Sequence, residues 1–153
     1  STSAAEGTFG FGGGVESVKF DACKVGRYVA IKTLNSYEEK SVATIGELDL
    51  LDENGALIPH TQWTVAYVSS EERYEMDGTA ENAIDGQTAS IWSTYFAHNT
   101  PEHPHVLIID LGSSRSLSGL RYVPGSNEGA MGYVRDYEIH VGNELVTYPA
   151  KEN

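Results

Sequence analysis

The sequence has little cysteine, little positive charge and no long hydrophobic run. Cys23 is the single cysteine in 153 residues, so an intramolecular disulfide framework is excluded. Ten Lys and Arg residues stand against 22 Asp and Glu residues, which gives a formal net charge of −12. Nucleic acids and anionic membranes are bound through basic patches, so this balance argues against both as partners. No run of about 18 apolar residues is present, so we expect no transmembrane helix.

The length and composition are those of one globular domain. Hydrophobic residues make up 40% of the chain and aromatic residues 10%, which argues against disorder. Residues 1–14 are small and glycine-rich, and we predict a flexible lead-in there, followed by a single domain over 15–153. The chain begins at Ser1 without a visible signal peptide. Because the first residue is not Met, we expect a mature or excised piece of a longer protein, which would have lost any targeting sequence.

Short strand patterns dominate the chain after residue 14. Apolar and polar residues alternate, and no window of useful length shows the 3.6-residue period of a helix. An Asn-Gly pair at 54–55 marks a tight turn between two such segments. About eight or nine strands, bounded by turn residues, predict an all-β sandwich or barrel. The clearest strand patterns lie at 15–20, 27–32, 47–51, 62–68, 106–109, 117–123 and 135–141.

Several motifs between residues 62 and 142 occur in a familiar order. Ala-Ile-Asp-Gly-Gln-Thr-Ala-Ser-Ile-Trp at 83–92 is followed by an apolar strand that ends in Asp-Leu-Gly at 110–112. Tyr-Val-Pro at 122–124 and Tyr-Glu-Ile-His-Val at 137–141 come next. This order resembles the discoidin domains, the coagulation-factor C-type domains that include the family 32 carbohydrate-binding modules. The resemblance implies an antiparallel β-sandwich of the jelly-roll type.

The segment 15–51 resembles the last strands of the same family, although here it comes first. Val-Lys-Phe at 18–20, Gly-Arg-Tyr-Val at 26–29 and Ile-Gly-Glu-Leu at 45–48 would normally follow the strand at 136–141. A circular permutation and a fragment that spans two tandem repeats both explain this order. We favour permutation, because the total length equals one domain and sandwich folds tolerate new termini in surface loops. It predicts that 15–20 or 27–32 pairs with 136–141 in the same chain.

The loop at Asp85 has the residue types of a calcium site. Asp85 supplies a carboxylate, a turn at Gly86 can aim the Gln87 carbonyl at the same point, and Ser90 can add a hydroxyl. Calcium takes six to eight such oxygen ligands. The residues alone also allow a plain turn without a metal. The resemblance adds two backbone carbonyls and a second carboxylate, so that the predicted ligands of a structural calcium are Gly46, Glu47, Asn82, Asp85, Gln87 and Ser90.

Two loops carry side chains that suit a sugar. A pyranose needs an apolar ring face for its C–H groups and planar polar groups for its hydroxyls. Both types occur in the loop at 93–101, and by resemblance the loop at 126–129 carries part of a sugar site. The predicted ligand-binding residues are Tyr95, Phe96, His98, Asn99, Asn127 and Glu128. Solvated loops with ordinary aromatic packing are the alternative, and we expect Trp63 and Trp92 in the core.

The sequence departs from the galactose-binding members of the family at two positions. Those members usually have Arg directly after Tyr-x-Pro, where this chain has Gly125. They often have His directly after the tryptophan of the metal loop, where this chain has Ser93. Glycan binding therefore remains the expectation, whereas a specificity for galactose is not implied.

No catalytic pattern stands out. The chain has no Gly-x-Ser-x-Gly elbow and no phosphate-binding loop, and its lone cysteine forms no recognisable pair with a histidine. We therefore predict a non-catalytic carbohydrate-binding module with one structural calcium, which targets a larger extracellular protein to an oligo- or polysaccharide. The negative charge disfavours polyanionic glycans as a bulk effect, although a local basic pocket could override it. The alternative is a protein-interaction or adhesion module, or a spacer, without sugar binding.

Overall fold

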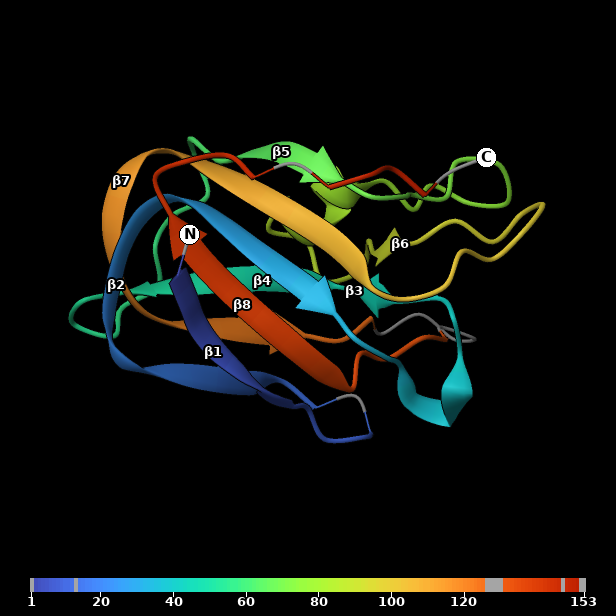
Figure 1. Cartoon of the computed structure of the whole chain (residues 1–153), viewed down its shortest axis with the longest axis horizontal. Helices are drawn as coiled ribbons and strands as arrows, with labels where there is room; N and C mark the ends of the chain where they lie inside the picture. Colours follow the sequence, from blue (N-terminus) through green and yellow to red (C-terminus); the bar gives the residue numbers. More distant parts are fainter. Residues whose placement is uncertain (1, 13, 126–130, 147, 152–153) are drawn as a thin grey trace.

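The computed structural model describes residues 2–12, 14–125, 131–146 and 148–151. Its main sheet has the order β1-β8-β2-β7-β4, with β5 paired to β7 outside that path, and β3 pairs with β6 in a separate small sheet (Figure 1). All the pairs are antiparallel. The strands are β1 (Thr2–Thr8), β2 (Glu16–Thr33), β3 (Thr44–Ile45), β4 (Glu47–Asp52), β5 (Thr64–Val68), β6 (Trp92–Ser93), β7 (His105–Val123) and β8 (Asp136–Gly142). The predicted all-β antiparallel sandwich is confirmed.

Two long strands, β2 and β7, build both layers of the sandwich. They pair with each other from end to end, with irregularities between Lys19 and Lys24 and between Gly26 and Tyr28. One half of β7 pairs with β5, and the other half pairs with β4. The bend in both strands therefore carries the chain from one layer to the other (Figure 1).

The N-terminal third of the chain is part of this sandwich. Residues Tyr28 to Thr33 of β2 pair with Tyr137 to Gly142 of β8 in the same chain. This is the pairing that the permuted order predicted for 27–32 and 136–141. Segment 15–51 and segment 62–142 thus share one set of sheets. The pairing fits a permuted strand order, which itself stays a prediction.

The structure differs from the predicted flexible lead-in. Residues 2–8 form β1, which pairs with β8, and Thr8 Oγ1 donates to Asp136 Oδ1 at 2.6 Å. Phe9 is buried and stacks between Tyr122 and Tyr137, with ring centroids 4.1 Å from each. Small residues let β1 lie close to its neighbour, and the buried phenyl ring anchors its end. A glycine-rich composition alone does not reveal such an anchor.

The core lies between the two layers and includes both tryptophans. Trp92 has no exposed surface, and its indole Nε1–H donates to the carbonyl of Ser70 at 3.0 Å. Trp63 is 8% exposed. The expectation that both rings pack in the core is confirmed, and neither offers a free face to a sugar.

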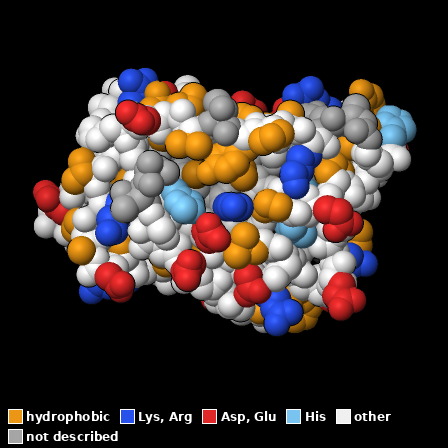
Figure 2. Space-filling model, viewed as in Figure 1, with side chains coloured by type: hydrophobic (Ala, Val, Ile, Leu, Met, Phe, Trp, Pro, Cys, Tyr) orange, Lys and Arg blue, Asp and Glu red, His pale blue; other side chains and the backbone are white. Residues whose placement is uncertain are grey.

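The surface carries no extended basic patch on the face that Figure 2 shows. Lys and Arg side chains lie dispersed among Asp and Glu side chains there, as a net charge of −12 leads one to expect. Within the described part of the chain, no helix is long and apolar enough to cross a membrane.

Candidate functional site

The loop that follows the short 3-10 helix η2 (Ala80–Ala83) gathers oxygen atoms around Ser90. Ser90 Oγ lies 2.6 Å from Asp85 Oδ2, 3.4 Å from the Gln87 carbonyl oxygen and 3.5 Å from the Asn82 carbonyl oxygen. A positive φ of 78° at Gly86 makes the tight turn that brings these groups together. Four of the predicted metal ligands therefore meet within one loop.

Glu47 reaches the same loop from β4. Its Oε2 accepts the Gly86 N–H at 2.9 Å, although 39 positions separate the two residues in the chain. The side chain is buried, and its Oε1 has no hydrogen-bond partner among the described residues. Burial raises the pKa of this carboxyl, and the nearby Asp85 carboxylate adds to the shift. A buried oxygen without a donor is costly, and a cation placed beside it would remove that cost.

Gly46, the remaining predicted ligand, lies directly before Glu47. Its N–H donates to the Val123 carbonyl at 2.8 Å. A Cβ at this position would lie 2.8 Å from the Pro124 carbonyl oxygen, so only glycine fits against the end of β7. The close approach holds β4 and β7 together beside the loop.

A cluster that the motifs did not reveal lies next to this loop. His60 places Nε2 2.8 Å from Asp49 Oδ1 and Nδ1 3.2 Å from Glu47 Oε2, and its ring stacks on Trp63 with centroids 3.9 Å apart. Arg121 pairs with the other oxygen of Asp49 at 2.8 Å. Ligand atoms of Glu47, Asp49 and His60 all lie within 4.8 Å of one another, so this cluster could hold a metal ion.

The sequence contained a weak signal for this cluster. Glu47 and Asp49 are two positions apart on a strand and therefore project to the same face. The Asn-Gly turn then returns the chain toward β4, where Ile58 N–H donates to the Leu50 carbonyl at 3.0 Å. His60 follows two residues later. The hairpin thus places an imidazole opposite two carboxylates.

His60 takes the protonated form in this arrangement. Burial favours the neutral ring, but hydrogen bonds to Asp49 and Glu47 outweigh it and raise the pKa of His60 to about 9. The imidazolium and the Arg121 guanidinium together then balance the charges of the two carboxylates.

We expect the stability of the metal-free protein to fall at alkaline pH because of His60. The pKa of His60 is about 9 in the folded protein and has its ordinary value of 6.5 in the unfolded chain. Protonation of His60 therefore stabilises the fold fully below pH 6.5, and this contribution is lost as the pH rises through about 9. Urea unfolding in EDTA between pH 6 and pH 9.5 measures the effect, which we expect to be about 1–3 kcal/mol. His60→Gln serves as the control and should flatten the profile. An equal decline in wild type and His60→Gln would contradict the assignment.

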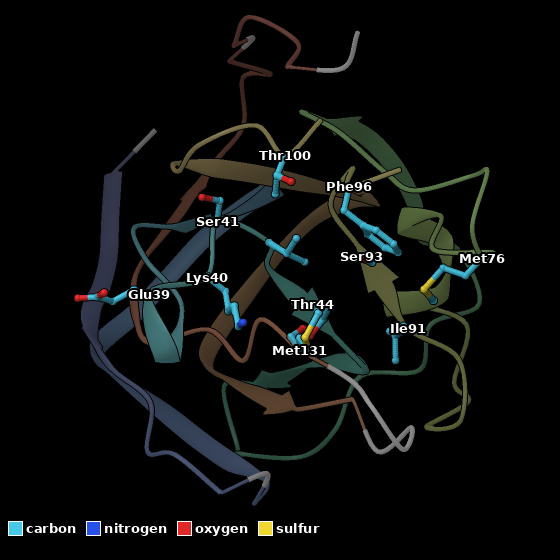
Figure 3. A pocket seen from close by; sticks show the side chains of 11 residues that line it. Glu39, Lys40, Ser41, Thr44, Met76, Ile91, Ser93, Phe96, Thr100 and Met131 are labelled. Carbon is cyan, nitrogen blue, oxygen red and sulfur yellow. The ribbon is translucent and has the colours of Figure 1, made fainter. Parts of the chain in front are cut away.

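A cavity of about 490 Å³ opens at the end of the sandwich where β3 pairs with β6. The connection from η1 (Tyr37–Glu39) to β3 forms one side of it, and loops before and after β6 form the other (Figure 3). Its apolar walls come from Met76, Ile91, Phe96 and Met131. Such a concave, largely apolar surface with a few polar groups is typical of a ligand site.

The predicted sugar-binding residues separate into different places. Phe96 lines the cavity and is half-buried. Asn99 is exposed and lies outside the lining. His98 is also exposed, and its Nδ1 is hydrogen-bonded to the Tyr95 hydroxyl. Asn127 and Glu128 lie outside the described residues.

Tyr95 does not have the stacking role that the sequence suggested. Its side chain is only 2% exposed, so its ring face is covered by protein. The Tyr95 N–H donates to Ser70 Oγ at 3.1 Å, which fixes the chain just after β6. Successive side chains of an extended segment point to opposite sides, so Tyr95 turns inward where Phe96 turns to the cavity.

One buried carboxylate, absent from the sequence prediction, holds the loops beside the cavity. Glu72 has no exposed surface. Its Oε1 accepts the N–H groups of Phe96 and Ala97 at 2.8 and 2.9 Å. Its Oε2 accepts those of Tyr74 and Glu75 at 2.8 and 2.9 Å. Burial opposes ionisation, but these donors outweigh it and keep the pKa of Glu72 below its usual value.

Comparison with known proteins places this arrangement in a family. The model of the F5/8 type C domain matches residues 65–152, more than half of the chain. A sialidase of Micromonospora viridifaciens is 38% identical over 93 residues, which cover 60% of this chain and 14% of that protein. A galactose oxidase of Gibberella zeae is 25% identical over 91 residues, which cover 59% of this chain and 13% of that protein. The chain thus corresponds to a small part of these relatives, and it belongs to the F5/8 type C, or discoidin, domain family.

Proposed function

We propose that this chain is a non-catalytic carbohydrate-binding module with a structural calcium, which targets a larger secreted protein to a glycan. The cavity between the 39–44 segment and Phe96 carries this proposal. An aromatic ring and apolar walls suit the C–H face of a pyranose, and the loops around the cavity are fixed in place by Glu72. The similarity to a sialidase and a galactose oxidase, both named for sugars, supports the same function.

The groups around the cavity favour binding over catalysis. Glycoside hydrolysis uses a pair of carboxylic acids that flank the scissile bond. Among the described residues, Glu39 is the single carboxylate in the lining of the cavity. We therefore assign no reaction to this site.

Calcium is the metal that the ligand set of the Ser90 loop favours. The groups gathered around the Ser90 hydroxyl are all oxygens, namely the Asp85 carboxylate and the carbonyls of Asn82 and Gln87, and the Glu47 carboxylate reaches the same loop at Gly86. Hard cations prefer such ligands, and calcium tolerates irregular geometry. The unpaired Oε1 of Glu47 supplies an unused ligand atom. Because β4 and the loop are far apart in the chain, the bound ion would tie the two segments together.

Calcium is expected to raise the midpoint of thermal unfolding by about 5–10 °C when its concentration is about 100 times the dissociation constant. Differential scanning fluorimetry with calcium and with EDTA measures the shift. Asp85→Asn should remove most of it, whereas Asp21→Asn, on the exposed surface of β2, should keep it. A full shift in Asp85→Asn would assign the ion to Glu47, Asp49 and His60 instead, and no shift in the wild type would contradict a metal site.

A glycan array of the purified chain, with calcium and with EDTA, tests the function. We expect specific binding to a defined glycan set. Phe96→Ala should weaken this binding about tenfold by removing the aromatic wall. Tyr74→Ala removes an exposed ring outside the cavity lining and should leave binding unchanged. Loss of binding in EDTA would show that the metal supports the loops. A folded sample that binds no glycan would contradict the proposal and favour a protein-interaction module or a spacer.

A further inference from the structure

The hydroxyl groups that line the cavity are partly engaged within the protein. Ser93 Oγ donates to the Thr94 carbonyl at 3.0 Å. Thr44 Oγ1 donates to the Met131 carbonyl at 2.8 Å. These hydroxyl protons are therefore not available to a ligand unless it displaces an existing bond. The strongest donor left in the lining is the ammonium group of Lys40, which carries a full positive charge.

Lys40 is held at the cavity by its backbone. Its N–H donates to the Tyr37 carbonyl, with a distance of 3.4 Å, and its carbonyl oxygen lies 3.2 Å from His103 Nε2. The two residues before it, Glu38 and Glu39, have φ values of 61° and 57°. Two consecutive non-glycine residues in the left-handed region are uncommon, and such residues cluster at functional sites. The turn presents Lys40 to the cavity.

The charge of Lys40 is not balanced by a described neighbour. Among the residues that the structure describes, no carboxylate lies within ion-pair distance of its Nζ. Figure 3 shows the Lys40 side chain reaching toward Thr44 and Met131, while the Glu39 carboxylate points away from it. Lys40 is exposed, so its ammonium lies at the rim of the cavity, and none of the described carboxylates pairs with it.

We infer that the cavity selects a sugar that carries an anionic group, a carboxylate or a sulfate, and that Lys40 Nζ binds this group. The inference rests on the proposed carbohydrate-binding function. The apolar walls at Phe96 and Met131 contact the C–H face and non-polar substituents of the sugar, while the ammonium binds its charge. The local positive charge overrides the negative field of the whole chain.

Matched pairs of neutral and acidic glycans test this selection. Isothermal titration of the wild type compares trigalacturonate with galactotriose, and galactose 6-sulfate with galactose. We expect the acidic member of at least one pair to bind about tenfold more tightly, and the two pairs separate carboxylate from sulfate. Lys40→Met keeps the length of the side chain and should remove this preference. Lys19→Met, which removes an exposed charge on β2, should keep it.

The outcomes separate this inference from the proposed function. Binding of neutral and acidic members with equal affinity would overturn the role of Lys40 and leave carbohydrate binding intact. An acidic preference that survives in Lys40→Met would also overturn that role. If no member of either pair binds and the glycan array is negative as well, the proposed function fails and the inference fails with it.

Discussion

Glu72→Gln is expected to lower the free energy of unfolding by about 3–5 kcal/mol and to abolish glycan binding. The wild-type carboxylate accepts two backbone N–H groups with each oxygen. A glutamine amide has one oxygen, so in either orientation its NH₂ group faces two N–H donors that have lost their acceptor. These donors are Phe96 and Ala97 in one orientation and Tyr74 and Glu75 in the other, so either orientation loosens a loop that Glu72 holds beside the cavity. Urea unfolding and isothermal titration with a glycan found on the array measure the two effects.

Glu75→Gln is the matched control for this variant. Glu75 is exposed and lies three positions after Glu72. The same loss of charge there should change stability by less than about 0.5 kcal/mol. A Glu72→Gln protein with wild-type stability and wild-type glycan affinity would contradict the role assigned to this carboxylate.

Trp92→Ala is expected to cost about 3–5 kcal/mol of stability, since it opens a large cavity in the core. The ring is fully buried, and the substitution also leaves the Ser70 carbonyl without its indole donor. Trp92 pairs with Ile45 between β6 and β3, so the damage would lie beneath the proposed sugar site. Chemical denaturation monitored by circular dichroism measures the loss.

Two further variants test whether the stability loss in Trp92→Ala comes from the lost core volume. Trp92→Phe keeps much of the buried volume and should lose less stability than Trp92→Ala. Val25→Ala changes an exposed residue of β2 and should have little effect. A stable Trp92→Ala protein that has lost only glycan affinity would show that the ring contacts sugar, which would contradict its place in the core.

The strands were predictable because alternation is a local signal, whereas their pairing was implied by the resemblance to the discoidin family. Alternation along 27–32 and 135–141 places apolar residues on one face of each strand, and the observed register of β2 and β8 joins these strands. The convergence of the loop at Asp85 was predictable for a similar reason, since Asp85, Gln87 and Ser90 lie within six residues of one another. The tight turn at Gly86 then brings their oxygens together.

The remaining parts of the site depend on contacts between distant segments, which no local pattern records. Glu72 looks like one acidic residue among many until the loop at 94–97 folds against it. Its role follows from burial, and burial is decided by tertiary packing. His60 likewise gains its pKa shift from carboxylates on β4 and not from its own neighbours in sequence.

Two expectations failed for identifiable physical reasons. Flexibility was inferred for residues 1–14 from their small side chains, but β8 offered a free edge to β1 and the core offered a place for Phe9. A binding role for Tyr95 was inferred from its polar loop, but the extended backbone after β6 directs that side chain inward. In both cases composition was a poorer guide than the position of a segment beside the sheet.

The central claim is that a glycan binds in the cavity between Lys40 and Phe96. An NMR titration of ¹⁵N-labelled protein with a glycan found on the array tests it most directly, because each backbone amide reports on its own surroundings. We predict that the largest shift changes fall on amides of residues 39–44, 76, 91–97 and 131, and that amides of β1 and β8 stay unchanged. Shift changes centred on the sheet faces or on the Tyr74–His98 surface would place the ligand elsewhere and contradict the claim.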